Sequence, residues 1–491
     1  MLLLASSFSG SSLSAYSSPN KGDYEAHRKW LSLTASLPAA RWYTHELEYW
    51  GCDYPPLCLF LHRALSLLVP FVAPKDTDLL DLNVRGYEGK VENLRALHIA
   101  AEYSLALPSL LLLLSSEPRA ARYPLAAFVL AAPLLPLVDH GHFQISNGVP
   151  LSLTFLALHF LSSSPDPPPR AMSLSAVLFT CSLLTKQMSL YFAPVFFCYM
   201  LSWSLRPPAP SLKLSRFLHL ALPVLATALL SFLPFPPPQW PHILSRIFPF
   251  QRGLFESKVS SLWCALDTYP LDVRRRLPAD ELQKLSLLAT VAAVLPACGA
   301  AYRLASNPSP KVPRLAPLLR CLHQSALSFY LFSFHVHEKT ILFPLLPLLL
   351  LAPHDLPHVA LFTAAALLSC WFLFVLDGLE TEMFAGLIMW VGACCLAAGD
   401  GAFHKAPRKR GGPLYELLRV PVPALAVAAM LALVAASKVL GAPERLPDLY
   451  PVLVSVAGFV AFAAAWLKAT ADVLQDARGA GGGGDKKSKG T

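Results

Sequence analysis

The feature that most constrains this chain is the recurrence of uncharged apolar runs along most of its 491 residues. Only 14% of the residues are charged and 54% are hydrophobic, whereas a soluble chain averages about 25% charged residues. A helix of ~20 apolar residues is long enough to cross a lipid bilayer. The composition therefore excludes a soluble globular enzyme, a disordered chain and a disulfide-stapled secreted domain. It predicts one all-α membrane domain with many spans.

The apolar runs predict thirteen transmembrane helices and one helix that lies along the membrane surface. The expected spans lie near 96–116, 123–138, 149–163, 171–185, 188–204, 217–235, 284–302, 321–334, 340–353, 357–376, 383–399, 420–437 and 449–467. A further run, 57–74, is apolar but contains His62 and Arg63, so we expect it to lie in the interface. A secondary transporter is disfavoured, because its fold typically carries an internal repeat and mid-membrane charges, and this sequence shows neither.

These runs divide the chain into four parts. Residues 1–16 start with a short apolar stretch that cannot span a bilayer and that lacks the basic start of a signal peptide. Residues 17–95 form a polar to amphipathic loop with the interfacial helix. Residues 96–470 form the multi-span domain, which includes a long loop at 236–283. Residues 471–491 form a polar, glycine-rich tail that we expect to be disordered and cytoplasmic.

The loops differ in charge from one side of the membrane to the other. The net charge of +9 comes from Lys and Arg that gather on alternate loops, which predicts that those loops are cytoplasmic and disfavours a nucleic-acid partner. The intervening loops, on the opposite side of the membrane, carry nearly every unusual polar cluster. They are 17–95, 139–142, 186–187, 236–283, 335–339 and 377–380. An enzyme or transporter needs such a one-sided polar site, and a noncatalytic scaffold does not.

Two acidic segments in the first loop suit general-base chemistry. Gly22 to Arg28 reads GDYEAHR, and Glu48 to Leu57 reads EYWGCDYPPL. A carboxylate near a membrane surface can accept a proton from a hydroxyl group. The proline pair that follows Asp53 fixes the backbone and with it the direction of the carboxylate. The alternative interpretation is a solvated loop with a tight turn.

Two His-x-His pairs raise the question of a metal. They are His140 with His142 and His335 with His337. This spacing fixes no third ligand, and the ten cysteines include no CxxC pair, so we predict no metal and no cofactor. His and Lys at a membrane face also suit a phosphate through charge-assisted hydrogen bonds. Additional cations on the same side are Arg246, Arg252 and Lys258. For any single cation, contact with a lipid headgroup is the alternative.

Six motifs occur in order along the chain: GDYEAHRKW, LEYWGCDYPPL, DHGHFQ, KQMSLYFAPVFF, RIFPFQRGLFESKVSSLWC and SFHVHEKTILFPLLP. They resemble the dolichyl-phosphate-glucose-dependent glucosyltransferases of the endoplasmic reticulum. That family builds the lipid-linked oligosaccharide used for protein N-glycosylation. WGCDYPPL with GLFESKVSSLWC resembles the branch that adds the first glucose, an alpha-1,3-glucosyltransferase acting on the Man9GlcNAc2 lipid. The second-glucose branch is the alternative.

The resemblance implies a GT-C fold, a lumenal first loop bearing the base, and an inverting, metal-free mechanism. Asp53 matches the catalytic aspartate of the family. The implied partners are dolichyl phosphate glucose, the lipid-linked oligosaccharide acceptor and membrane lipid. For the donor phosphate we predict His337 and Lys339 first, then Arg252 and Lys186. On the acceptor side, or as loop structure, we place Asp23, Glu25, Asp139 and His142.

The sequence departs from the family in two places. The family usually has fourteen helices, with one before the GDYEA motif, and this chain predicts thirteen, so we expect its first span to be missing. The family's HFQYN motif reads here His142-Phe143-Gln144-Ile145-Ser146-Asn147, with one aromatic lost and one residue gained.

Overall fold

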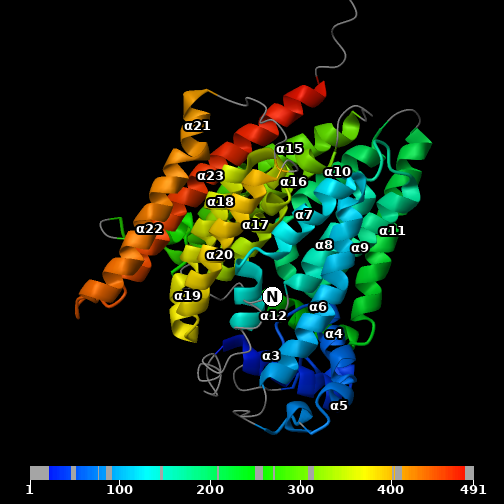
Figure 1. The fold of residues 1–491 in the computed structure, drawn as a ribbon. Helices are drawn as coiled ribbons and strands as arrows, with labels where there is room; N and C mark the ends of the chain where they lie inside the picture. The colour runs from blue at the N-terminus through cyan, green and yellow to red at the C-terminus, as the bar shows by residue number, and fades with distance from the viewer. Residues whose placement is uncertain are drawn as a thin grey trace, which may run out of the picture.

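The structure, a computed structural model, describes most of the chain. The described residues are 22–45, 51–75, 77–84, 91–143, 147–206, 210–248, 258–268, 271–307, 314–400, 403 and 412–481. Within these ranges every regular element is a helix, which confirms the predicted all-α fold. Figure 1 shows long helices running side by side, with α3, α4 and α5 gathered at one end. That end is named the cap end here, and the end at which α23 finishes is named the tail end.

The cap consists of α3 (Gly22–Ser36), η1 (Ala39–Arg41), α4 (Pro56–Ser66), α5 (Val69–Val72) and η2 (Thr77–Leu80). The bundle follows with α6 (Val91–Leu113), η3 (Leu114–Ser116), α7 (Arg119–Leu130), η4 (Pro136–Gly141), α8 (Gly148–Ser162), α9 (Pro169–Thr185), η5 (Gln187–Tyr191), α10 (Ala193–Ser204) and α11 (Pro210–Phe232). The connection at the cap end holds η6 (Pro237–Gln239), α12 (Trp240–Ile247), α13 (Leu262–Leu266) and α14 (Val273–Arg276). The chain ends with α15 (Ala279–Ser306), α16 (Leu315–Phe332), η7 (Glu338–Ile341), α17 (Leu342–Leu349), α18 (Ala352–Ser369), α19 (Trp371–Asp377), α20 (Glu380–Gly399), α21 (Pro413–Arg419), α22 (Pro421–Leu440) and α23 (Leu449–Gly481).

Each of the thirteen predicted spans contains a helix, but the helices differ in length. Among the described residues, six are long and apolar enough to cross a membrane, and α18 with α19, bent by 45°, makes a possible seventh. Others, such as α8 and α10, are apolar but shorter. Prolines contribute to the breaks, because a proline has no N–H for the helix ladder. The multi-pass architecture is therefore confirmed, with span lengths less regular than hydropathy predicts.

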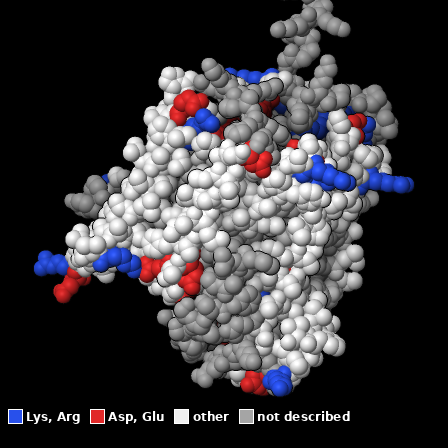
Figure 2. Space-filling view, viewed as in Figure 1, with Lys and Arg blue, Asp and Glu red and all other residues white. Residues whose placement is uncertain are grey.

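Charged side chains gather toward the two ends of the bundle. Figure 2 shows a broad band of uncharged surface between them on the face in view. Helices α11, α15 and α22 expose many leucines and valines along their length, among them Leu222, Leu230, Leu287, Leu295 and Leu425. Apolar surface of this extent suits lipid rather than water. The basic predicted loops follow α8, α10 and α15 at the tail end, and the polar clusters lie at the cap end.

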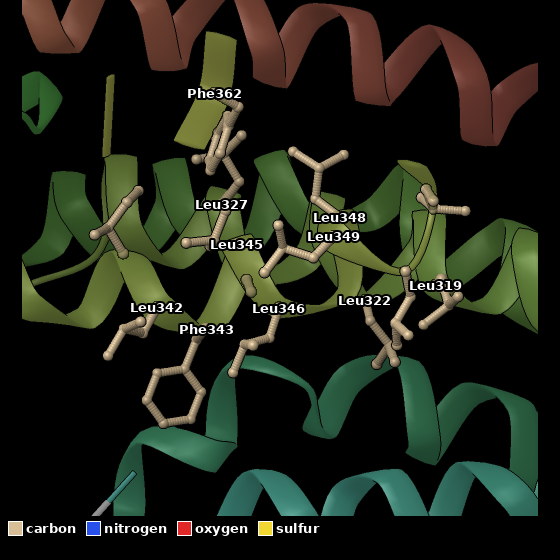
Figure 3. Close-up of a cluster of buried hydrophobic side chains, with 14 of the residues drawn as sticks. Leu319, Leu322, Leu327, Leu342, Phe343, Leu345, Leu346, Leu348, Leu349 and Phe362 are labelled. Atoms are coloured by element: carbon tan, nitrogen blue, oxygen red, sulfur yellow. The ribbon is translucent and has the colours of Figure 1, made fainter. Parts of the chain in front are cut away.

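Helix α17 lies at the centre of the bundle. All eight of its residues are buried, and its leucines pack against α16 and α18, as Figure 3 shows for Leu327, Leu345 and Phe362. A helix that is apolar on every side can be stable only when other helices surround it. On α16, His323 Nδ1 lies 2.8 Å from the carbonyl oxygen of Pro344, a distance at which it donates a hydrogen bond.

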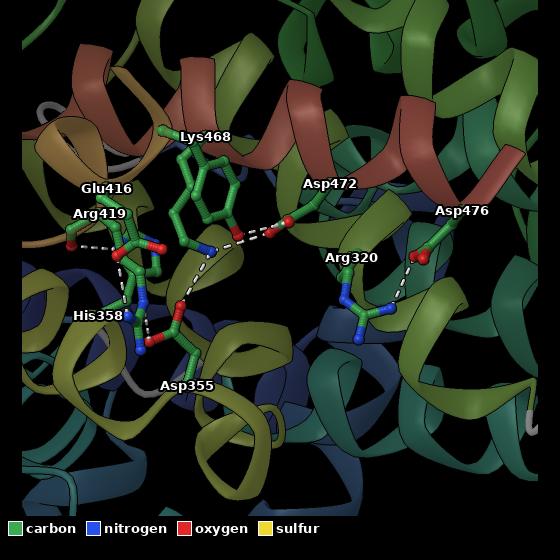
Figure 4. Close-up of polar contacts among 9 residues, drawn as sticks. Arg320, Asp355, His358, Glu416, Arg419, Lys468, Asp472 and Asp476 are labelled. Atoms are coloured by element: carbon green, nitrogen blue, oxygen red, sulfur yellow. Dashed lines mark hydrogen bonds and ion pairs between the residues drawn. The ribbon is translucent and has the colours of Figure 1, made fainter. Parts of the chain in front are cut away.

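A buried charge network ties three helices together near the tail end (Figure 4). Lys468 of α23 lies 3.1 Å from Asp355 of α18 and 2.9 Å from Asp472. Arg419 of α21 reaches the same Asp355 at 2.9 Å. Asp355 lies in the stretch 354–356, which separates two predicted spans and contains no Lys or Arg. Its carboxylate instead forms ion pairs with basic side chains of two other helices.

The C-terminal tail begins later than predicted. Residues 471–491 were expected to be disordered from the first residue, but α23 continues to Gly481. The reason is that the helix is held by ion pairs beyond residue 470. Asp472 pairs with Lys468, and Asp476 lies 2.6 Å from Arg320 of α16. Residues 482–491 lie outside the described residues.

The predicted interfacial segment 57–74 folds as α4 and α5. Helix α4 buries Leu59 and Leu65, whereas the turn into α5 exposes Leu67, Leu68 and Phe71, the last at 83%. Apolar side chains exposed in this way are typical of a helix that contacts lipid headgroups. Contact with the membrane surface stays a prediction for this segment. The boundary at residue 95 shifts, because α6 already begins at Val91.

Candidate active site

The polar residues of the cap end lie where helices begin or end. Asp23 is the second residue of α3, Lys186 follows α9 directly, Lys339 lies in η7, and Asp377 is the last residue of α19. His142 follows the π-helical turn η4. A bundle in which successive helices alternate direction brings such ends to one face. The cap covers this face, since α4 packs on α9 and α11.

Four of these residues form one buried charge cluster. Lys339 Nζ donates a hydrogen bond to Asp23 Oδ2 at 2.7 Å. His142 Nε2 lies 3.3 Å from Lys339 Nζ and 3.5 Å from Asp23 Oδ2. On its other side, His142 Nδ1 lies 2.6 Å from Asp377 Oδ2. The cluster joins α3, η4, η7 and α19, which are far apart in the sequence.

The electrostatics of the cluster follow from these distances. Burial would raise the pKa of Asp23, but the Lys339 ammonium and His142 outweigh it and hold that pKa well below its usual value. Burial and Lys339 would lower the pKa of His142, but hydrogen bonds to Asp23 and Asp377 raise it to about 9. Burial opposes the charge of Lys339 too, yet Asp23 raises its pKa. At neutral pH the cluster therefore holds an ammonium, an imidazolium and the carboxylate of Asp23.

Lys186 connects this cluster with the loop of the predicted base. Its ammonium lies 5.3 Å from the centre of the Tyr54 ring, a cation–π distance. The next residue, Gln187, donates to the backbone oxygen of Asp53 at 3.3 Å. Burial lowers the pKa of Lys186 to about 8, although the nearby Asp139 raises it. Asp53 itself is half-buried and immediately precedes the turn into α4.

Asp139 lies in the turn η4 and binds the start of α8. Its Oδ1 accepts a hydrogen bond from the Asn147 side chain, and its Oδ2 accepts one from the Gly148 N–H at 3.1 Å. Burial raises the pKa of Asp139 to about 6, against the lowering effect of Lys186. These contacts support the loop-structure alternative for Asp139. They also give Asn147, which belongs to the altered HFQISN stretch, a defined role in the turn.

Glu25 forms an ion pair with Arg28 inside the cap. Arg28 donates to both of its carboxylate oxygens, at 2.6 and 2.8 Å, and both side chains are buried. The same guanidinium donates to the backbone oxygens of Asp78, Asp81 and Val84. The pair therefore anchors the segment that follows η2 to α3. For Glu25, too, the geometry supports the loop-structure alternative.

The remaining predicted cations are placed differently. His337 packs edge-on against His335, with ring centres 5.0 Å apart, and lies at the start of η7, two residues before Lys339. Arg252 lies outside the described residues. Arg246 donates to the backbone oxygen of Tyr43 at 3.0 Å. It passes so close to Gly51 that a Cβ there would overlap its guanidinium.

Within the described ranges no group of three or more His, Cys, Asp or Glu side chains is arranged to hold a metal ion. The first His-x-His pair is split between two environments. His142 faces Asp377, whereas His140 Nε2 lies 3.5 Å from Glu102 Oε2. In the second pair, the two rings pack on each other.

Sequence reasoning missed the pairing of Asp377 with His142. It placed residues 377–380 on the same side of the membrane as the other polar clusters, but it assigned Asp377 no role. The two residues are separated by 235 positions, and only the fold brings them together. Helix α19 ends at Asp377 because Gly378 adopts a left-handed φ of 71°, a conformation that glycine adopts without strain.

The chain is similar to known glycosyltransferases over most of its length. Residues 3–468 match the ALG6, ALG8 glycosyltransferase family. A probable dolichyl pyrophosphate Man9GlcNAc2 alpha-1,3-glucosyltransferase of Schizosaccharomyces pombe is 34% identical over 388 residues, which are 76% of this chain and 72% of that protein. The dolichyl pyrophosphate Man9GlcNAc2 alpha-1,3-glucosyltransferase of Mus musculus is 33% identical over 492 residues, 92% of this chain and 91% of its own.

The fold, the one-sided charged site and these similarities define a multi-pass membrane glycosyltransferase. More narrowly, the chain belongs to the ALG6, ALG8 glycosyltransferase family. The family resemblance carried by the six sequence motifs is thereby confirmed.

Proposed function

We propose that this chain transfers the first glucose from dolichyl phosphate glucose to Man9GlcNAc2-PP-dolichol. The new linkage is alpha-1,3, and the reaction serves protein N-glycosylation at the lumenal face of the endoplasmic reticulum membrane. The names of the relatives in fission yeast and mouse support this acceptor and linkage. The basic loops, which favour the cytoplasm, support a lumenal cap end. The WGCDYPPL and GLFESKVSSLWC motifs support the first-glucose branch.

The observation that carries the proposal is the gathering of cations beside the Asp53 loop. Lys186 packs on Tyr54, and Gln187 holds the backbone of Asp53. The charge of Lys186 interacts with Lys339 and Asp23 of the buried cluster. A proton acceptor and a phosphate-binding group are the two things that glucosyl transfer from a phosphate donor requires. In this proposal Asp53 supplies the proton acceptor, and the cations of the cap end supply the phosphate-binding group.

The reaction can be written with these groups. Asp53 accepts the proton of a mannose hydroxyl of the acceptor. That oxygen forms a bond to the anomeric carbon on the face opposite the phosphate, and the bond from that carbon to the phosphate oxygen breaks. The electron pair of the broken bond stays on dolichyl phosphate, whose charge becomes more negative. Lys339 and Lys186 stabilise this developing charge. Inversion converts a beta-linked donor into an alpha-linked product.

The proposal can be tested in a Saccharomyces cerevisiae strain that lacks its own first-glucose enzyme. The chain, its Asp53→Asn variant and an Asp81→Asn control are expressed, and the lipid-linked oligosaccharides are sized. Asp81 is an exposed carboxylate of the same cap. We expect glucosylated species with the natural chain and the control, and only the nine-mannose species with Asp53→Asn. Rescue of a strain lacking the second-glucose enzyme instead would favour the alternative branch.

A further inference from the structure

His142 is enclosed by charged groups from three elements. Asp377 of α19 faces its Nδ1, while Asp23 of α3 and Lys339 of η7 face its Nε2. The side chain of His142 is 8% exposed and that of Asp377 is 11% exposed. Its near neighbour His140 points elsewhere, to Glu102. The charged partners of the His142 ring are therefore Asp377, Asp23 and Lys339.

The oxygen of Asp23 marks a place where an anion is held. Asp23 Oδ2 lies 2.7 Å from Lys339 Nζ and 3.5 Å from His142 Nε2. Two cationic groups thus converge on one carboxylate oxygen. A phosphate oxygen carries the same charge and accepts the same hydrogen bonds. The Asp23 side chain is 31% exposed, so part of it is open to an incoming substrate.

The carboxylate of Asp377 determines what His142 can do there. It accepts a hydrogen bond from Nδ1–H at 2.6 Å, so that the Nε2–H is directed toward the carboxylate of Asp23, beside the Lys339 ammonium. A carboxylate on one ring nitrogen fixes the orientation of the ring and favours its charged form. The arrangement presents an imidazolium beside an ammonium, which suits an anion that gains charge during the reaction.

We propose that His142 and Lys339 together bind the phosphate of the donor, in place of Asp23, and that Asp377 is the positioning residue that orients His142 for this. The inference rests on the proposed function, which supplies the phosphate donor. It moves His142 to the phosphate side, whereas the sequence-based hypothesis placed it on the acceptor side or in the structure of the loop. When the bond to the anomeric carbon breaks, the phosphate gains negative charge. The imidazolium therefore affects kcat more than KM.

The test uses the full chain in lipid nanodiscs, with turnover of dolichyl phosphate glucose measured from pH 6 to pH 9. Asp377→Asn removes the carboxylate charge from the imidazolium. If its pKa falls to the ordinary 6.5, the charged fraction drops about twentyfold between pH 6 and pH 8. We expect near-normal kcat at pH 6 and a loss of about tenfold or more at pH 8.

Asp377→Glu should restore the alkaline activity. Glu380→Gln, which removes a nearby carboxylate paired with Lys438, should leave the profile unchanged.

A second measurement separates this inference from the proposed function. Binding of a short-chain isoprenyl phosphate, which carries no sugar, is compared between the natural chain and His142→Gln. We expect about tenfold weaker binding in the variant at pH 6. This result would stand even if the natural chain transferred no glucose, an outcome that would overturn only the proposed function. A pH profile of Asp377→Asn that parallels the natural one, or unchanged phosphate binding by His142→Gln, would overturn the inference.

Discussion

Lys339 Nζ lies 2.7 Å from Asp23 Oδ2, although 316 positions separate the two residues. The contact closes the cap onto the bundle at the proposed donor site. It joins the GDYEAHRKW motif to the HVHEK motif, which are the first and the last of the six motifs. The two ends of the family signature are thus parts of one charged cluster.

Replacing Lys339 tests the importance of that cation. Lys339→Met removes the ammonium that would face the leaving phosphate and leaves Asp23 with His142 as its cationic neighbour. We expect kcat to fall about 100-fold, the size of loss typical when one transition-state donor is removed. Turnover of dolichyl phosphate glucose measures it. Lys339→Arg should recover part of the rate, and Lys284→Met, at an exposed ion pair of α15, should lose none. A rate within threefold of the natural chain would contradict a role at the phosphate.

Lys186 should set the alkaline limit of activity. Because burial lowers its pKa to about 8, its ammonium is present below pH 8 and is lost as the pH rises through that value. We therefore expect kcat to decline above pH 8. Lys186→Arg keeps its charge at every pH used, so its decline should begin closer to pH 9, where His142 loses its proton. Identical pH profiles for the two proteins would exclude Lys186 as the group that titrates.

The buried network at the tail end should matter for stability and not for chemistry. Asp355→Asn leaves Lys468 and Arg419 with less compensating charge near the end of the bundle. Breaking a buried ion pair costs about 3 kcal/mol or more. We expect a lower unfolding temperature in detergent, with the KM for the donor unchanged. Asp280→Asn, at an exposed pair with Lys284, is the matched control and should leave the unfolding temperature close to that of the natural chain, because solvent screens exposed ion pairs. Equal unfolding temperatures for the two variants would refute the importance of the network.

Gly148 is predicted to accept no side chain. A Cβ at this position would lie 2.8 Å from Glu102 Cδ, and the Glu102 side chain is itself buried. Gly148→Ala should therefore destabilise the protein by about 1–3 kcal/mol through overpacking. The control is Gly299→Ala in α15, where nothing lies within 4 Å of the added methyl group. It should be neutral or stabilising, because alanine favours a helix over glycine. Thermal unfolding of both variants distinguishes the two cases.

Sequence reasoning predicted the bundle well, because long apolar runs admit few other structures. Each predicted span contains a helix, and the polar clusters lie at one end. Its predictions of helix length were less accurate. Helix α17 is short and wholly buried, and hydropathy does not distinguish a buried helix from one that faces lipid. It also ended α23 too early, since hydropathy ignores the ion pairs of Asp472 and Asp476.

The sequence predicted which residues lie at the site, but it did not predict which of their side chains contact one another. The motifs named Asp23, His142, Lys186 and Lys339, and the structure places all four at the cap end. Which groups touch depends on helix ends that meet only in the fold. Asp377 illustrates this, because nothing near it in the sequence indicates that it faces His142.

We propose that Asp53 is the base with which this chain adds the first glucose. The most direct measurement incubates the purified chain with dolichyl phosphate glucose and Man9GlcNAc2-PP-dolichol, and determines the linkage of the product by nuclear magnetic resonance. We expect a single alpha-1,3-linked glucose on the nine-mannose acceptor and no product with Asp53→Asn. Transfer only to an acceptor that already carries one glucose, or full activity of the Asp53→Asn variant, would contradict this proposal.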